Sequence, residues 1–249
     1  MKLLLINPNT TAAMTDRVLS VARQVVAPGT ELVGATGRFG AAYVATRSAY
    51  AIAAHAALDA WAESTAGSNG GGFDAVLLAC FGDPGLDGLR ELSPVPVIGM
   101  ADASIQLAAS LGRRFGIVTG GERWGAMLRE FVASRGLSDR LAAVQTVAPT
   151  GGDIARDPAG SMALLARACR DAADAGADHV ILGGAGLAGL AAAIRDQVPV
   201  PVIDSTIAAV RMTEAVAAEH LAKAQSGSFA LPPAVPSINL SPALAARIS

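Results

Sequence analysis

The sequence predicts an α/β fold of two similar lobes, each a mostly parallel four-stranded sheet flanked by helices, with a cleft between them. Short apolar runs that end in turn-rich loops alternate with Ala-rich stretches of helical periodicity, the pattern of a parallel sheet with crossover helices. The chain also repeats itself: residues 74–86 recur at 178–190, and the segment PVPVI at 94–98 recurs at 199–203. Two blocks in the same order at nearly the same spacing indicate an internal duplication.

In the first half, each predicted strand is an apolar run closed by a turn signal. The segment NPNTT at 7–11 forms a turn whose Asn and Thr side chains can cap the next helix. A Gly- and Ser-rich loop at 64–72 precedes the third strand. Strands are expected at 2–6, 30–35, 73–79 and 96–100, and helices at 12–26, 43–63, 86–92 and 101–111.

The second half predicts the same order of elements, and its last helix is expected to pack back on the first lobe. Lobe one then comprises residues 1–100 plus 207–225, and lobe two residues 101–206. Residues 226–249 contain Gly, Ser and Pro breaks and are expected to form a tail or an arm for a partner subunit. Strands are expected at 114–118, 142–147, 179–182 and 201–203, and helices at 124–135, 158–176 and 207–225.

Composition excludes several classes of protein. The 249 residues are 52% hydrophobic and 16% charged, which fits a chain with a large buried core. The net charge of −2 and the lack of a basic cluster argue against a nucleic-acid partner. No apolar run reaches the roughly 20 residues of a membrane span, and the apolar start is too short for a signal peptide. We therefore expect a cytoplasmic protein with no membrane partner.

Cys80 is the candidate for chemistry, because it closes a buried strand at the sheet edge where open α/β folds bind ligands. A thiol there can be a nucleophile, a proton donor or acceptor, or a redox centre. No cysteine is adjacent for redox chemistry, and no histidine lies at a corresponding strand end to activate a nucleophile. Proton transfer needs only the thiol and nearby amides that stabilise an enolate. The alternative is that Cys80 is an ordinary buried strand residue.

The other candidates each have a plain structural alternative. Asn9 either serves turn and cap chemistry alone or also lines the cleft above the first strand. Arg47 lies near a helix start, where it either anchors an anion or is a solvated surface charge. Cys169 lies in a helical stretch and is expected in the core. The three histidines are scattered, so no metal site is expected.

Three segments resemble the aspartate/glutamate/hydantoin racemase superfamily, with the hydantoin and allantoin racemase branch most similar. They are NPNTT at 7–11, ACFGDPGL at 79–86, and LGGAG at 182–186 with PVID at 201–204. The resemblance covers about residues 1–222. It implies a cofactor-independent enzyme of two pseudo-symmetric lobes. In this family one cysteine from each lobe faces opposite sides of a substrate carbon; one removes a proton and the other delivers one.

Carried over by motif, the first cysteine of the family is Cys80, and the second falls at Gly184. Asn9 and the backbone around Thr119 and Gly120 match positions that hold carboxylate or imide oxygens of the substrate. The segment at 43–48 differs from the family's, and an Arg there suits a carboxylate. From the residues and the resemblance together, we expect substrate binding by Asn9, Thr10, Arg47, Phe81, Gly82, Thr119, Gly120, Gly184 and Ala185, with no metal or cofactor.

The expected function is a racemase or isomerase that moves a proton at the α carbon of a small carboxylate or hydantoin-like substrate. Cys80 would be one acid/base group, and a water, Ser205 or Thr206 the other. One alternative is a lyase that uses Cys80 alone, similar to arylmalonate decarboxylases, whose single cysteine lies in the other lobe. Another is a member of the family that binds a small carboxylate without turnover. We expect a homo-oligomer.

Overall fold

The computed structural model describes residues 1–67 and 72–248, and part of the predicted 64–72 loop lies outside them. Within the described residues, the strands form two four-stranded sheets in the orders β2-β1-β3-β4 and β6-β5-β7-β8, with every pairing parallel. The strands are β1 (Lys2–Asn7), β2 (Glu31–Thr36), β3 (Ala75–Leu78), β4 (Val97–Gly99), β5 (Phe115–Gly120), β6 (Leu141–Val147), β7 (His179–Leu182) and β8 (Val202–Asp204). The two-lobed α/β prediction is confirmed, and both lobes share one strand order.

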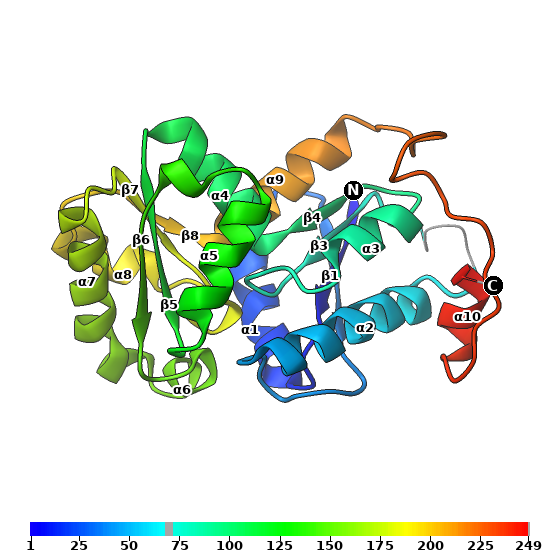
Figure 1. The fold of residues 1–249 in the computed structure, drawn as a ribbon, viewed down its shortest axis with the longest axis horizontal. Coiled ribbons are helices and arrows are strands. Elements are labelled where there is room, and N and C mark those ends of the chain that lie inside the picture. Colours follow the sequence, from blue (N-terminus) through cyan, green and yellow to red (C-terminus); the bar gives the residue numbers. More distant parts are fainter. Residues whose placement is uncertain (68–71, 249) are drawn as a thin grey trace.

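Lobe one is the part around β1–β4, and lobe two is the part around β5–β8 (Figure 1). Each apolar strand is followed by a helix that returns over the sheet, as parallel pairing requires. The helices are α1 (Ala12–Arg23), α2 (Arg47–Ser64), α3 (Leu86–Leu92), α4 (Met100–Leu111), α5 (Trp124–Ser134), α6 (Gly151–Arg156), α7 (Pro158–Asp174), α8 (Ala191–Ile194), α9 (Ser205–Ala218) and α10 (Pro242–Ile248), with 3-10 turns η1 (Ser138–Arg140), η2 (Ala185–Leu187) and η3 (Arg195–Gln197).

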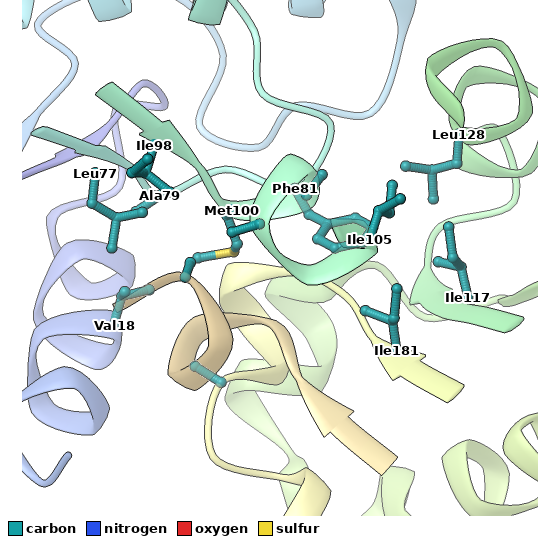
Figure 2. Close-up of a cluster of buried hydrophobic side chains, with 14 of the residues drawn as sticks. Val18, Leu77, Ala79, Phe81, Ile98, Met100, Ile105, Ile117, Leu128 and Ile181 are labelled. Atoms are coloured by element: carbon teal, nitrogen blue, oxygen red, sulfur yellow. The ribbon is translucent and has the colours of Figure 1, made fainter. Parts of the chain in front are cut away.

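Helices α4 and α9 join the lobes by exchange. Helix α4 follows the last strand of lobe one and packs on β7 and β8 of lobe two, whereas α9 follows the last strand of lobe two and packs on β3 and β4 of lobe one. The two helices also pack on each other. One buried cluster therefore runs from Leu77 and Ile98 through Met100 to Ile117 and Ile181 (Figure 2). The hydrophobic effect acting on this cluster holds the lobes together.

A close contact between the lobes lies at Phe81. Its buried ring lies against the backbone of Gly183, where an added Cβ would come within 2.5 Å of ring carbons. Such a distance is well below van der Waals contact, so residue 183 has to be glycine for the ring to lie there. The loops after β3 and β7 therefore face each other with one aromatic ring between them.

Helices α2, α9 and α6 differ from the sequence prediction. Helix α2 begins at Arg47 rather than at residue 43, because the Thr46 side chain accepts a hydrogen bond from the N–H of Ala49 and caps the helix. Helix α9 ends at Ala218, before His220 adopts a φ of +49°. Helix α6 was not predicted; it is one short segment with a capping box.

The tail holds a helix that the sequence did not indicate. Helix α10 packs on α2 near its end (Figure 1). Leu244 is 1% exposed in the cluster that contains Trp61. Arg247 lies over the Trp61 ring and donates a hydrogen bond to the carbonyl of Thr65 at 2.6 Å. None of the helices in the described part of the chain combines the length and the apolar character that a membrane span requires.

The docking of α10 predicts a stability effect. Leu244→Ala should lower the free energy of unfolding by about 2 kcal/mol, since a buried leucine leaves a cavity when it is truncated. Leu221→Ala is the control, because that side chain is 61% exposed, and should change stability by less than about 0.5 kcal/mol. Denaturant unfolding measures both. Equal stabilities of the two variants would contradict the docking.

The contact at Phe81 predicts a second effect. Gly183→Ala should cost roughly 1–3 kcal/mol, because the added methyl displaces the Phe81 ring. The matched control is Gly125→Ala in α5, where an added Cβ would meet Thr146 at an ordinary 3.5 Å. That variant should be neutral or more stable, since alanine favours helix. Thermal unfolding compares the two; a neutral Gly183→Ala would show that the lobes do not meet as described.

Candidate active site

A cavity lies between the two lobes beside Cys80. Its walls are neutral: within residues 1–67 and 72–248, no Asp, Glu, Lys, Arg or His lines it. Apolar side chains form most of the surface, and the polar groups are few. The lining residues are Met14, Val44, Ala79, Phe81, Trp124 and Leu187; Asn9, Tyr43, Cys80 and Thr119; and the backbone at Gly151, Gly184, Ala185 and Gly186.

Cys80 lies in the loop that follows β3, where the parallel strand ends at the cleft. The thiol is partly buried. Burial, and to a lesser extent the negative charge of Asp83, raise the pKa of Cys80 to about 12. Removing the thiol proton in an apolar wall leaves a poorly solvated thiolate, so the resting group at neutral pH is the thiol. A protonated thiol beside a cavity is a proton donor, and it becomes a base once it has given up its proton.

Hydrogen-bond donors surround the thiol on the lobe one side. Asn9 accepts at Oδ1 from the N–H of Thr11 and from Asn7 Nδ2, both at 2.9 Å. These bonds occupy the oxygen and leave the Nδ2 group of Asn9 as the donor available at the cavity. Within the described residues, the backbone N–H groups of Phe81 and Gly82 take part in no hydrogen bond. Neutral donors beside a proton-transfer group suit a carbonyl oxygen that gains negative charge.

In the loop of lobe two that follows β7, Gly184 is the residue that corresponds to Cys80 in the duplicated segment. Gly184 has a φ of +134°, which L side chains rarely adopt, and its N–H donates to Ser205 Oγ at 3.2 Å. An added Cβ would lie 3.4 Å from Leu187 and 3.6 Å from Thr119 Oγ1. There is room for a side chain, but the backbone favours glycine. Thr119 lines the cavity beside Gly184, whereas Ser205 accepts the hydrogen bond from Gly184 and is not among the lining residues.

Residues 43 and 44 of lobe one close the cavity against lobe two. The hydroxyl of Tyr43 donates to the carbonyl of Gly120 at 3.2 Å and accepts from the N–H of Gly151 at 3.0 Å. The indole N–H of Trp124 donates to the carbonyl of Val44 at 3.0 Å. Burial raises the pKa of Tyr43, so this phenol stays neutral. The closed cavity depends on three hydrogen bonds that cross between the lobes.

The structure brings six of the predicted site residues together and leaves four outside the cavity. Asn9, Cys80, Phe81, Thr119, Gly184 and Ala185 line it; Thr10, Arg47, Gly82 and Gly120 do not. The Arg47 side chain is exposed and forms an ion pair with Glu130 of α5. It lies in a neighbouring groove between α2 and α5, so it does not reach a ligand in this cavity.

Several residues that close or line the cavity were not predicted from the sequence. Tyr43 and Val44 were assigned to a helix, and Gly151 belongs to the unpredicted helix α6. Met14 and Trp124 lie in the helices expected at 12–26 and 124–135, and Leu187 lies in no expected element. The one available signal was the pair of aromatic residues in a chain with only 4% aromatics. Within the described residues, no group of His, Cys, Asp and Glu is placed to hold a metal ion.

Comparisons with known proteins agree with this architecture. A family model described as Asp/Glu/Hydantoin racemase matches residues 3–213. Hydantoin racemase from Paenarthrobacter aurescens is 34% identical over 235 residues, which cover 93% of this chain and 98% of that protein. Allantoin racemase from Pseudomonas fluorescens superposes with a TM-score of 0.88 at 33% identity, covering 96% of this chain and 100% of that one.

A double mutant of arylmalonate decarboxylase, solved in its liganded form, shares the fold with a TM-score of 0.65 at 18% identity, covering 92% of this chain and 97% of that one. The family match spans both lobes and includes the loops that hold Cys80 and Gly184. The chain therefore belongs to the Asp/Glu/hydantoin racemase family.

Proposed function

We propose that this protein is a cofactor-independent racemase that moves a proton at the α carbon of a small hydantoin-like substrate, with Cys80 as the acid/base group of lobe one. The observation that carries the proposal is the position of the Cys80 thiol in the wall of a cavity between the lobes. Two independent points support it. Among the described residues that line the cavity there is no second thiol and no histidine for other cysteine chemistry, and the chain belongs to a racemase family.

The neutral lining favours a hydantoin-like ring over a carboxylate. The donors at the cavity include the Asn9 amide and the backbone N–H of Phe81, and no cationic side chain is among its lining residues in the described part of the chain. A ring of amides and carbonyls needs hydrogen bonds without a counter-charge, whereas a carboxylate loses its hydration when it enters such a site. Arg47, the residue that would suit a carboxylate, lies outside. Relatives named hydantoin racemase and allantoin racemase agree with this choice.

The proposed reaction balances through one thiol and one water. The thiolate form of Cys80, a minor fraction beside the resting thiol, takes the proton from the α carbon, and the electron pair moves onto the adjacent carbonyl oxygen to give an enolate. Asn9 and the free N–H groups near Cys80 stabilise that oxygen. A water beside Gly184 and Thr119 then gives a proton to the opposite face of the carbon. The hydroxide that remains takes the proton from the Cys80 thiol, which restores both groups.

The single thiol also supports a second candidate, a lyase that delivers a proton from one face only. Its observation is the glycine-type backbone at Gly184, which leaves the face of lobe two without a thiol. Such an enzyme would release CO2 from a substituted malonate and protonate the resulting enediolate with the Cys80 thiol. The likeness in fold to arylmalonate decarboxylase is compatible with this reaction.

A deuterium experiment tests the proposal. One enantiomer of a 5-substituted hydantoin, incubated with the protein in D2O, should gain deuterium at carbon 5 and lose optical activity. Cys80→Ser should slow both by at least about 100-fold, because the hydroxyl is a much weaker acid and base here. Cys169→Ala, at a buried position in α7 that is not among the lining residues of the cavity, should keep the rate.

Other outcomes of the deuterium experiment would contradict the racemase proposal. Deuterium uptake with retained configuration, or CO2 release from an arylmalonate, would support the one-face lyase and overturn the racemase. Full turnover by Cys80→Ser would overturn both, since both depend on that thiol. Binding of hydantoins without any exchange would indicate a member of the family that does not catalyse.

The raised pKa of Cys80 predicts the pH dependence. Because the pKa of Cys80 is about 12, the fraction of thiolate rises about tenfold with each pH unit, as long as the pH is below that value. Alkylation of Cys80 by iodoacetamide, followed by mass spectrometry, should therefore keep rising from about pH 7 to about pH 10. A rate that levels off near neutral pH would mean that the cavity stabilises the thiolate, which is the opposite of what burial does here.

A further inference from the structure

Asp83 lies three residues after Cys80 and is only 2% exposed. Its N–H donates to the carbonyl of Cys80 at 2.9 Å. Its carboxylate accepts from the N–H of Ala101 at 2.9 Å and from that of Asp102 at 2.7 Å, in the first turn of α4. The residue has a φ of +54°, in the left-handed region that Asp tolerates better than most residues. The loop of Cys80 is therefore attached to the exchanged helix by one side chain.

The two lobes cap the corresponding helices, α4 and α9, with carboxylates from different places in the chain. In lobe two, Asp204 ends strand β8 and caps α9 through the N–H groups of Thr206 and Ile207. The duplicated position in lobe one is Gly99, at the end of β4. A side chain there would overlap the carboxylate of Asp83. In lobe one the capping carboxylate thus comes from the loop that carries the thiol, and the strand leaves space for it.

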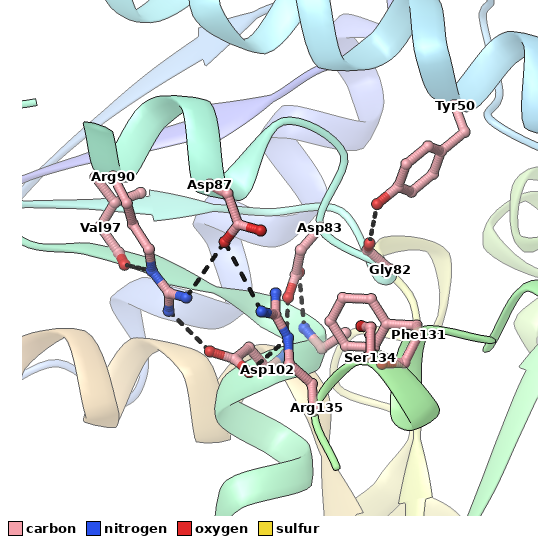
Figure 3. A network of polar contacts seen from close by, with 11 residues as sticks. Tyr50, Gly82, Asp83, Asp87, Arg90, Val97, Asp102, Phe131, Ser134 and Arg135 are labelled. Carbon is pink, nitrogen blue, oxygen red and sulfur yellow. Dashed lines mark hydrogen bonds and ion pairs between the residues drawn. The ribbon is translucent and has the colours of Figure 1, made fainter. Parts of the chain in front are cut away.

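The same turn of α4 is held from lobe two. Asp102 pairs with Arg90 of α3 at 2.8 Å and with Arg135, at the end of α5, at 3.3 Å. Arg135 also lies 3.8 Å from Asp87 of α3. Figure 3 shows these groups around Asp83, with Tyr50 bonded to the carbonyl of Gly82 on the other side of the loop. An arginine of lobe two therefore reaches the anchor of the Cys80 loop.

We propose that Asp83 is the positioning residue of Cys80: its carboxylate fixes the thiol loop to α4, and the Asp102–Arg135 ion pair links that anchor to lobe two. The inference deepens the proposed proton transfer and rests on it for its catalytic consequence. Asp83 is not among the residues that line the cavity. Its effect on turnover therefore passes through Cys80. A thiol held by both lobes keeps one distance to the substrate carbon when the cleft is closed.

Asp83 also affects the thiol through its charge. Burial raises the pKa of Asp83 to about 7, and its negative charge raises the pKa of Cys80. The charged or titratable groups that face Asp83 are Tyr50 from α2, Asp87 from α3, Asp102 from α4 and Arg135 from α5. Removing the charge of Asp83 while keeping its shape should make the Cys80 thiol easier to deprotonate.

The experiment measures iodoacetamide labelling of Cys80 in the whole protein without substrate, across a pH series. Asp83→Asn keeps the shape but has one acceptor for two N–H donors and no charge. Cys80 should be labelled about three- to tenfold faster at equal pH, with the profile moved to lower pH. Asp157→Asn is the matched control, since Asp157 also caps a helix, α7, at an exposed position. It should leave Cys80 labelling within about twofold of the parent.

Turnover separates a positioning role from lost stability. In Asp83→Asn, kcat for hydantoin exchange should fall about tenfold or more while KM changes little, because binding groups remain and the thiol is misplaced. Asp157→Asn should change neither. Labelling and pH profile identical to the parent in Asp83→Asn would overturn the inference. If the parent exchanges no hydantoin proton but Asp83→Asn still labels faster, the proposed function fails and the link between Asp83 and Cys80 stands.

Arg135→Gln provides a second test should Asp83→Asn not fold. It removes the ion pair with Asp102 and leaves Asp83 intact. Labelling of Cys80 should rise by about two- to threefold, because the anchor loses its tie to lobe two. Unchanged labelling in a folded Arg135→Gln variant would overturn the part of the proposal that links the thiol to lobe two.

Discussion

The structure depends on the close approach of two loops, one from each half of the chain. The ring of Phe81 lies on the backbone of Gly183, with no space for a side chain on the latter. The exchanged helices α4 and α9 bring the loops to this distance, because each leaves one lobe and packs on the sheet of the other. The cavity beside Cys80 follows from this contact, since its two main walls are those same loops.

The two lobes are built alike, but the loops that carry Cys80 and Gly184 differ in what they place at the cavity. The two sheets have the same strand order, and the last strand of each lobe leads into a helix that is capped by a buried carboxylate. They differ in the source of that carboxylate and in the group that faces the cavity. Lobe one offers the Cys80 thiol on a loop anchored by Asp83. Lobe two offers the bare backbone of Gly184 in a conformation that a side chain would strain.

Neutral groups control the chemistry of the cavity. Burial keeps the Cys80 thiol and the Tyr43 phenol protonated, and both pKa values are raised by loss of solvent. The donors beside the thiol are amides, which stabilise developing charge on a carbonyl without attracting an anion strongly in the ground state. Such a site suits a reaction in which charge appears on the substrate only during proton transfer.

The sequence by itself determined the two-lobed α/β fold, the duplication, the order of the strands along the chain and the position of Cys80 at a strand end. These features are local or periodic: apolar runs, turn residues and a repeated segment. The tertiary structure alone decided that Tyr43, Val44 and Trp124 close the cavity, that Arg47 lies outside it, and that α10 packs on α2. Those contacts join residues far apart in the chain, and no local pattern encodes which distant side chain fills a given space.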